Sequence, residues 1–85
     1  MLTKEVTVKS TAGLHARPAT LLVKTASTFK SKIEIEYNGK RINGKTLIGI
    51  LSLGIGSGEK VKIFASGEDE NKALAQMVKV IENVE

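Results

Sequence analysis

The residues with the clearest capacity for chemistry lie in one stretch, Gly13-Leu14-His15-Ala16-Arg17-Pro18. His15 is the only histidine of the chain, and a neutral imidazole is a nucleophile. Pro18 is favoured in the first turn of a helix, so a helix is predicted to begin here. That turn has unpaired N–H groups and the positive end of the helix dipole, both of which would stabilise a phosphate on His15. Arg17 would neutralise the oxygens of a transferring phosphoryl group. The alternative is a histidine that only borders a helix, followed by an ordinary solvated arginine.

A second candidate is the apolar run Leu47-Ile48-Gly49-Ile50-Leu51, which lies in a predicted short helix from Thr46 to Leu53 with Thr46 as N-cap. A helix this short cannot turn all of these side chains inward, so part of the run is predicted to form an exposed apolar patch. Basic residues would border the patch if the elements pack as expected, and such surfaces are typical of protein docking. These residues are Arg17, Lys24, Lys40 and Lys45. The alternative is that two of the apolar side chains are scattered surface residues.

The composition excludes several classes of site. The chain has no cysteine and one histidine, which excludes disulfides, thiolate metal sites and multi-histidine metal sites, so no metal is expected. The net charge of +4 favours acidic partners or phosphate. Glycines 54, 56 and 58 superficially suggest a phosphate-binding loop. They lack its sequence pattern, however, and are interpreted as a flexible connector.

Hydrophobic periodicity predicts the elements that must position these residues. Strands are predicted where apolar residues alternate, and a hairpin turn at Asn38-Gly39, where positive φ angles are needed. Helices are predicted where apolar residues recur at three-and-four spacing. The predicted strands are Leu2 to Lys9, Lys32 to Tyr37, Lys40 to Asn43 and Glu59 to Ser66. The predicted long helices run from about His15 to Ser27 and from near Asp69, the latter with Ala73, Leu74, Met77, Val78, Ile81 and Val84 on one stripe.

The predicted order is strand, helix, strand, strand, short helix, strand, helix. Polar outer strand positions indicate a four-stranded antiparallel sheet with one solvated face, the other being covered by the two longer helices. The fold class is therefore α+β, an open-faced β-sandwich of βαββαβα order, in one domain over residues 1–85. Phe64 falls on the outer face by parity, where it would be an exposed aromatic residue. Met1-Leu2 is soon followed by the charged Lys4 and Glu5, and no apolar stretch is long enough for a signal peptide or a membrane span, so neither is expected.

Over essentially its whole length the sequence resembles HPr, the family of histidine phosphocarriers of the bacterial phosphoenolpyruvate-dependent sugar phosphotransferase system. It is more similar to the Gram-positive type than to the enteric type. The stretch Gly13-Leu14-His15-Ala16-Arg17-Pro18-Ala19-Thr20 resembles the active-site motif of the family. Glu36-Tyr37-Asn38-Gly39-Lys40 and Leu51-Ser52-Leu53-Gly54-Ile55 are similar to its hairpin and to the end of its short helix.

The resemblance implies that His15 accepts a phosphoryl group on Nδ1 from phosphorylated enzyme I and passes it to the enzyme IIA domains of sugar permeases. It also implies that Arg17 interacts with the phosphate. The implied partner-binding residues are Lys24, Lys45, Leu47, Ile48 and Leu51. Such a protein is a cytoplasmic, stoichiometric phosphoryl carrier within a relay. It is not itself an enzyme and needs no cofactor.

The sequence departs from the family pattern at two positions. Low-GC Gram-positive members carry a serine at position 46 that HPr kinase/phosphorylase modifies, which creates a corepressor for the transcription factor CcpA. This chain has Thr46, which keeps a hydroxyl group but adds a methyl group. Position 12 is commonly a small polar residue and is Ala12 here, so one local hydrogen bond is expected to be missing.

Two other functions compete with phosphoryl carriage. The first is a regulatory binding module that controls carbon catabolite repression through phosphorylation of Thr46, since a helix N-cap accommodates a phosphate. The second is a small basic nucleic-acid binder. With three aromatic residues and no RNP-like motif or GxxG clamp, no nucleic-acid partner is expected.

Overall fold

The computed structural model describes residues 1–83, and its element order is the predicted βαββαβα. The elements are β1 (Leu2–Thr7), α1 (Ala16–Ser27), β2 (Lys32–Tyr37), β3 (Lys40–Asn43), α2 (Leu47–Ser52), β4 (Lys60–Ser66) and α3 (Glu70–Asn83). The observed boundaries lie within two residues of the predicted ones; β1, for example, ends at Thr7 and not at Lys9. The predicted stripe on the last helix is described up to Ile81, and Val84 lies outside the described residues.

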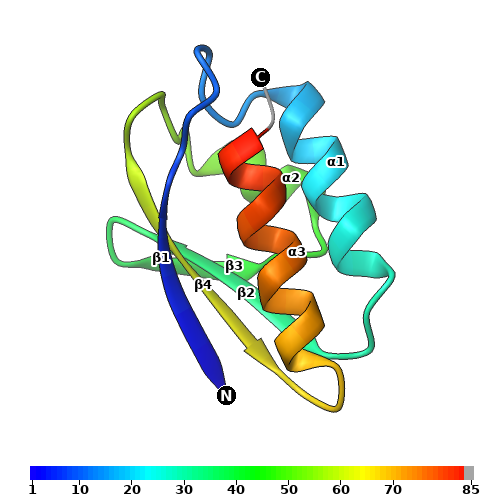
Figure 1. Ribbon diagram of the computed structural model, residues 1–85. Helices are drawn as coiled ribbons and strands as arrows, with labels where there is room; N and C mark the ends of the chain where they lie inside the picture. The colour runs from blue at the N-terminus through cyan, green and yellow to red at the C-terminus, as the bar shows by residue number, and fades with distance from the viewer. Residues whose placement is uncertain (84–85) are drawn as a thin grey trace.

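The four strands form a sheet in the order β1-β4-β2-β3, with every neighbouring pair antiparallel. Figure 1 shows α1 and α3 side by side across one face of this sheet, which leaves the other face open. The predicted open-faced sandwich is therefore confirmed. The hairpin prediction is also confirmed, because Asn38 and Gly39 have φ angles of 54° and 82° and Tyr37 pairs with Lys40 across the turn.

The core lies between the sheet and the two long helices. Alternate strand residues point inward because successive side chains of a strand face opposite sides of the sheet. The inward positions of the strands are Val6, Ile33, Ile35, Val61, Ile63 and Ala65, each at most 3% exposed. The helices contribute Ala19, Leu22, Ala26, Ile50, Ala73, Met77, Val78 and Ile81. This core fixes where the ends of α1 and α2 emerge at the surface.

Phe64 lies on the outer face of the sheet, as parity predicted, but it is half-buried rather than exposed. The guanidinium of Arg41 lies 3.7 Å from the centre of the Phe64 ring. Glu34 holds this guanidinium in place, with 3.0 Å between Arg41 Nη2 and Glu34 Oε1. A cation stacked on an aromatic ring is favourable, so Phe64 on β4 is covered by a side chain from β3 that a residue of the intervening β2 holds in place.

A carboxylate ties the end of α1 to the beginning of α3. Asp69, which immediately precedes α3, accepts hydrogen bonds from the backbone N–H groups of Lys30 and Ser31, both at 2.9 Å, and from the Ser31 hydroxyl. Because these donors stabilise the charged form, above all the Ser31 hydroxyl, they lower the pKa of Asp69 from 3.8 to about 2. This contact lies at the end of α1 opposite to His15.

Candidate functional site

His15 is the N-cap residue of α1 and is exposed. Its backbone is extended, with φ −81° and ψ −172°, and its carbonyl oxygen accepts a hydrogen bond from the N–H of Ala19 at 3.0 Å. The backbone thus makes the first helical bond, whereas the imidazole makes no capping hydrogen bond. An exposed imidazole at a helix terminus is what the sequence predicted, and its ring is available for chemistry.

The first turn of α1 forms an anion-binding environment beside His15. The N–H groups of Ala16 and Arg17 precede the first residue that can bond back to the helix, and Pro18 has no N–H. The turn contains no acidic residue that would compete for these donors. Pro18 is buried, so it anchors the turn in the core, and Arg17 is exposed. The first turn therefore has two backbone N–H groups without helical partners and an exposed arginine two residues after His15, features that favour an anion.

The loop before His15 packs against the connector at residues 54–58. Leu14 is buried and its N–H donates to the carbonyl oxygen of Ile55 at 3.0 Å. Gly13 has φ +74°, and a Cβ atom at this position would lie 2.4 Å from Ile55 O and 2.8 Å from Gly56 Cα. Ile55 is only 4% exposed. The connector is therefore a packed support of the His15 loop, a role that the sequence interpretation missed although an apolar Ile55 between glycines was its signal.

Glu59 holds the connector from the other side. Its Oε2 accepts the N–H of Gly56 at 2.6 Å, and its Oε1 accepts the hydroxyl of Tyr37. Because both donors favour the carboxylate, the Tyr37 hydroxyl most strongly, the pKa of Glu59 is lowered. The same hydrogen bond to Glu59 raises the pKa of Tyr37. The sequence reasoning did not identify this contact, because Tyr37 ends β2 and Glu59 precedes β4, and the two residues meet only in the folded sheet.

The apolar run divides between core and surface as predicted. Ile50 is fully buried, Leu47 is half-buried against the core, and Ile48 and Leu51 are 80% and 39% exposed. Helix α2, which carries these exposed side chains, packs against α1. On α1, Leu21 is also exposed, at 42%, and the sequence reasoning did not single it out.

The basic residues expected around the patch differ in their surroundings. Arg17 and Lys24 are exposed on α1, at its first and last turns. Lys45 is half-buried, and its Nζ donates to the carbonyl oxygen of Phe29 at 2.9 Å, which ties the start of α2 to the end of α1. Lys40 is exposed next to the hairpin turn. Arg17 and Lys24 lie on α1, and α1 packs against α2, the helix that carries the exposed apolar side chains.

Thr46 caps α2, with its Oγ1 accepting the N–H of Gly49 at 3.4 Å. Its methyl group lies over Gly49, where a Cβ atom would come within 2.5 Å of Thr46 Cγ2. The hydroxyl of Thr46 is thus at the start of α2, as predicted. The additional methyl group of threonine is accommodated because residue 49 is glycine.

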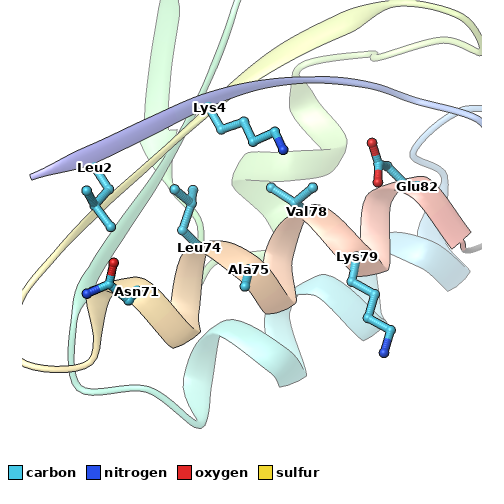
Figure 2. A pocket seen from close by; sticks show the side chains of 8 residues that line it. All are labelled: Leu2, Lys4, Asn71, Leu74, Ala75, Val78, Lys79 and Glu82. Atoms are coloured by element: carbon cyan, nitrogen blue, oxygen red, sulfur yellow. The ribbon is translucent and has the colours of Figure 1, made fainter.

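The part of the chain that the structure describes also has two surface hollows that are not lined by His15, Arg17 or the residues of α2. One, of about 410 Å³, is formed between β1 and α3 and is lined by Leu2, Lys4, Asn71, Leu74, Ala75, Val78, Lys79 and Glu82. Figure 2 shows Lys4 extending from β1 toward Val78, whereas the Lys79 side chain points away from β1. The other, of about 490 Å³, is lined by Thr25, Thr28, Phe29, Lys72, Ala75 and Gln76. Neither hollow includes His15 or Arg17.

Two further features are absent from residues 1–83, a cluster of metal-ligating side chains and a membrane-spanning helix. They contain no group of three or more histidine or acidic side chains arranged to hold a metal ion. None of the helices in this range has both the length and the apolar character needed to cross a bilayer.

Comparison with known proteins identifies the family of this chain. The family model described as "PTS HPr component phosphorylation site" matches residues 2–83. The crystal structure of HPr-C-His from Thermoanaerobacter tengcongensis is 45% identical, with a TM-score of 0.93 over 96% of this chain and 92% of that chain. The phosphocarrier protein HPr from Bacillus anthracis strain Ames is 40% identical, with a TM-score of 0.91 over 94% and 95% of the two chains.

The similar structures also include a protein named for catabolite repression. Crh of Bacillus subtilis is 38% identical, with a TM-score of 0.78 over 96% of this chain and 94% of that chain. The family model, the high structural similarity over nearly the whole chain and the exposed histidine at the start of α1 agree. This chain therefore belongs to the HPr family of phosphocarrier proteins of the phosphotransferase system.

Proposed function

We propose that this protein carries phosphoryl groups in the sugar phosphotransferase system and that His15 is the residue that accepts them. The observation that carries this proposal is the exposed, uncapped imidazole of His15 at the N-terminus of a twelve-residue helix. An imidazole at this position is a free nucleophile, and the nearby backbone N–H groups can donate hydrogen bonds to the phosphoryl group that it would accept. Membership of the HPr family supports the same reading.

The transfer is a displacement at phosphorus. A lone pair on Nδ1 of neutral His15 forms the new N–P bond, while the bond between phosphorus and the donor breaks and leaves its electrons on the donor. The N–H groups of Ala16 and Arg17 and the guanidinium of Arg17 stabilise the negative oxygens during this step. The reverse displacement on an acceptor returns His15 to its starting state. The protein is thus a carrier that is regenerated in each cycle and needs no cofactor.

The partners in this proposal are enzyme I as donor and the enzyme IIA domains of sugar permeases as acceptors, which places the protein in the cytoplasm. Both must approach the same exposed His15. The candidate partner contacts on and around α1 and α2 are the exposed apolar Ile48 and Leu51, the half-buried Leu47, and the cations Arg17, Lys24 and Lys45, of which Lys45 lies at the end of α1 away from His15. A carrier that exchanges partners rapidly needs an interface of the small, transient class.

Incubation with phosphoenolpyruvate and enzyme I tests the proposal. The wild-type protein is expected to gain one acid-labile phosphoryl group, measured by intact mass, and His15→Ala is expected to gain none. Arg17→Ala, which keeps the histidine, is expected to be labelled more slowly. Labelling of the His15→Ala protein would contradict the assignment of His15.

A second role at Thr46 is favoured by the similarity to Crh and by the position of the hydroxyl at the start of α2. In this role HPr kinase/phosphorylase modifies Thr46, and the added charge beside the exposed Ile48 changes the affinity for the transcription factor CcpA. Incubation with ATP and the kinase, followed by mass spectrometry, tests it. Thr46→Ser should be modified at least as rapidly as wild type and Thr46→Ala should not be modified. An unmodified wild-type protein beside a modified Thr46→Ser protein would exclude the role.

A further inference from the structure

We propose that Glu59 is a positioning residue for His15: its carboxylate braces residues 54–58, and this segment supports the loop that carries the histidine. The inference rests on the proposed function of His15 and adds a residue that acts on it from outside the site. Glu59 immediately precedes β4. The connection can be followed through hydrogen bonds and close contacts.

The first link joins Glu59 to the connector. One carboxylate oxygen accepts the N–H of Gly56 at 2.6 Å, and the other accepts the hydroxyl of Tyr37 at the end of β2. Tyr37 belongs to a strand in the middle of the sheet, so it fixes the carboxylate relative to a rigid element. The carboxylate in turn fixes the backbone of Gly56. A hydrogen bond to an ionised acceptor is stronger than one between neutral groups.

The second link joins the connector to the histidine loop. The carbonyl oxygen of Ile55, next to Gly56, accepts the N–H of Leu14, which directly precedes His15. Gly13 lies so close to Ile55 and Gly56 that there is no room even for a Cβ atom between the two backbones. A displacement of residues 55–56 must therefore be transmitted to residues 13–14.

The connector needs such a brace because of its composition. Gly54, Gly56 and Gly58 make up three of its five residues, and Gly54 and Gly58 have φ angles of +64° and +80°. Glycine loses more conformational entropy on ordering than any other residue, so this segment is costly to hold in one conformation. The carboxylate of Glu59 provides a fixed acceptor at its centre. Positioning matters for transfer because small misplacements of a reacting group strongly reduce rates.

Four variants separate this role from a general effect on stability. Glu59→Ala removes both hydrogen bonds of the carboxylate, to Gly56 and to Tyr37, and Tyr37→Phe removes only the second of them. Glu59→Gln is the conservative rescue, since its amide oxygen can accept from Gly56 while its NH2 donates to the Tyr37 oxygen. Asp69→Ala is the matched control, because it removes a carboxylate that likewise accepts from the backbone and from a hydroxyl group, but at the far end of α1, about 18 Å from His15 along the helix.

The readouts are local as well as catalytic. Amide hydrogen exchange at Leu14, compared with global unfolding in urea, measures whether the loop is held. NMR resonances of the His15 imidazole report its surroundings, and the rate of labelling by phosphoenolpyruvate and enzyme I reports the chemistry. We expect Glu59→Ala to accelerate local exchange at Leu14, to shift the His15 resonances and to lower the labelling rate by about tenfold. Tyr37→Phe should show smaller changes in the same direction, and Glu59→Gln should be close to wild type.

Asp69→Ala should lower global stability but leave the His15 resonances and the labelling rate near wild-type values. The inference is overturned if Glu59→Ala, or Tyr37→Phe where Glu59→Ala does not fold, retains wild-type Leu14 exchange and labelling. It is also overturned if Asp69→Ala has the same local effects. Failure of the proposed function is a different result, namely a wild-type protein that is not labelled at His15 at all.

Discussion

Replacement of Gly13 by alanine tests whether the His15 loop and the connector are packed as closely as the structure shows. Gly13 has φ +74°, which an L side chain adopts at a cost of about 1–2 kcal/mol. The new Cβ atom would also lie 2.4 Å from the backbone oxygen of Ile55, so one of the two segments must move. Overpacking of this kind costs about 1–3 kcal/mol.

The unfolded state offsets part of this cost, because alanine has less conformational freedom there than glycine, by about 0.4–1 kcal/mol. The free energy of unfolding should therefore fall by about 2–4 kcal/mol. Gly39→Ala is the matched control. Gly39 has a similar φ of +82°, but a Cβ atom added there would meet no other atom within 4 Å, so only the backbone term applies and the loss should be about 0.5–1 kcal/mol.

Urea unfolding of both variants measures the difference directly. With a slope of about 1 kcal/mol per M for a small domain, Gly13→Ala should unfold at least about 1 M earlier than Gly39→Ala. The movement forced on residues 13–14 should also slow phosphoryl transfer in Gly13→Ala, whereas Gly39→Ala should be labelled at the wild-type rate. Equal stability losses in the two variants would refute the close packing, and a wild-type transfer rate in Gly13→Ala would refute its importance for His15.

Three further predictions concern stability. Because the pKa of Asp69 is lowered to about 2, the stability that its carboxylate contributes is fully present above the ordinary value of 3.8 and is lost as the pH falls through 2. Asp69→Asn should therefore lower the stability at neutral pH and reduce the fall of the urea midpoint in acid. An unchanged fall of the midpoint would contradict the assignment. Ile50→Ala should cost about 3 kcal/mol in urea unfolding because Ile50 is fully buried, whereas Ile48→Ala, 80% exposed, should change stability by less than about 0.5 kcal/mol; similar losses would refute the observed orientation of α2. Ser10→Ala should raise the unfolding free energy by about 1 kcal/mol, because the buried Ser10 hydroxyl has no hydrogen-bond partner among residues 1–83; a loss of stability would show that the hydroxyl is satisfied.

Local sequence signals were sufficient where the relevant physics is local. Alternation at Ile33 and Ile35 predicted an inward strand face, and Asn38-Gly39 predicted the hairpin because both residues tolerate positive φ. The position of His15 at the start of a helix followed from apolar spacing and from Pro18 in the first turn. Helical geometry alone predicted that part of the apolar run is exposed, whereas the structure shows which residues these are, with Ile50 buried and Ile48 exposed.

Contacts between segments distant in the chain depended on the tertiary structure. The fold alone brings Ile55 beneath Leu14, Glu59 against Tyr37 and Asp69 against Ser31, because antiparallel pairing of β4 with β2 sets which ends of the chain meet. The covering of Phe64 by Arg41 likewise depends on the alignment of three strands. Periodicity within one segment specifies the face on which a side chain lies, but the residue it contacts there is set by the register of another segment. The sequence by itself therefore determined the place of His15 at a helix start and pointed to the chemistry proposed for it, whereas only the tertiary structure decided which segment the loop before that histidine packs against.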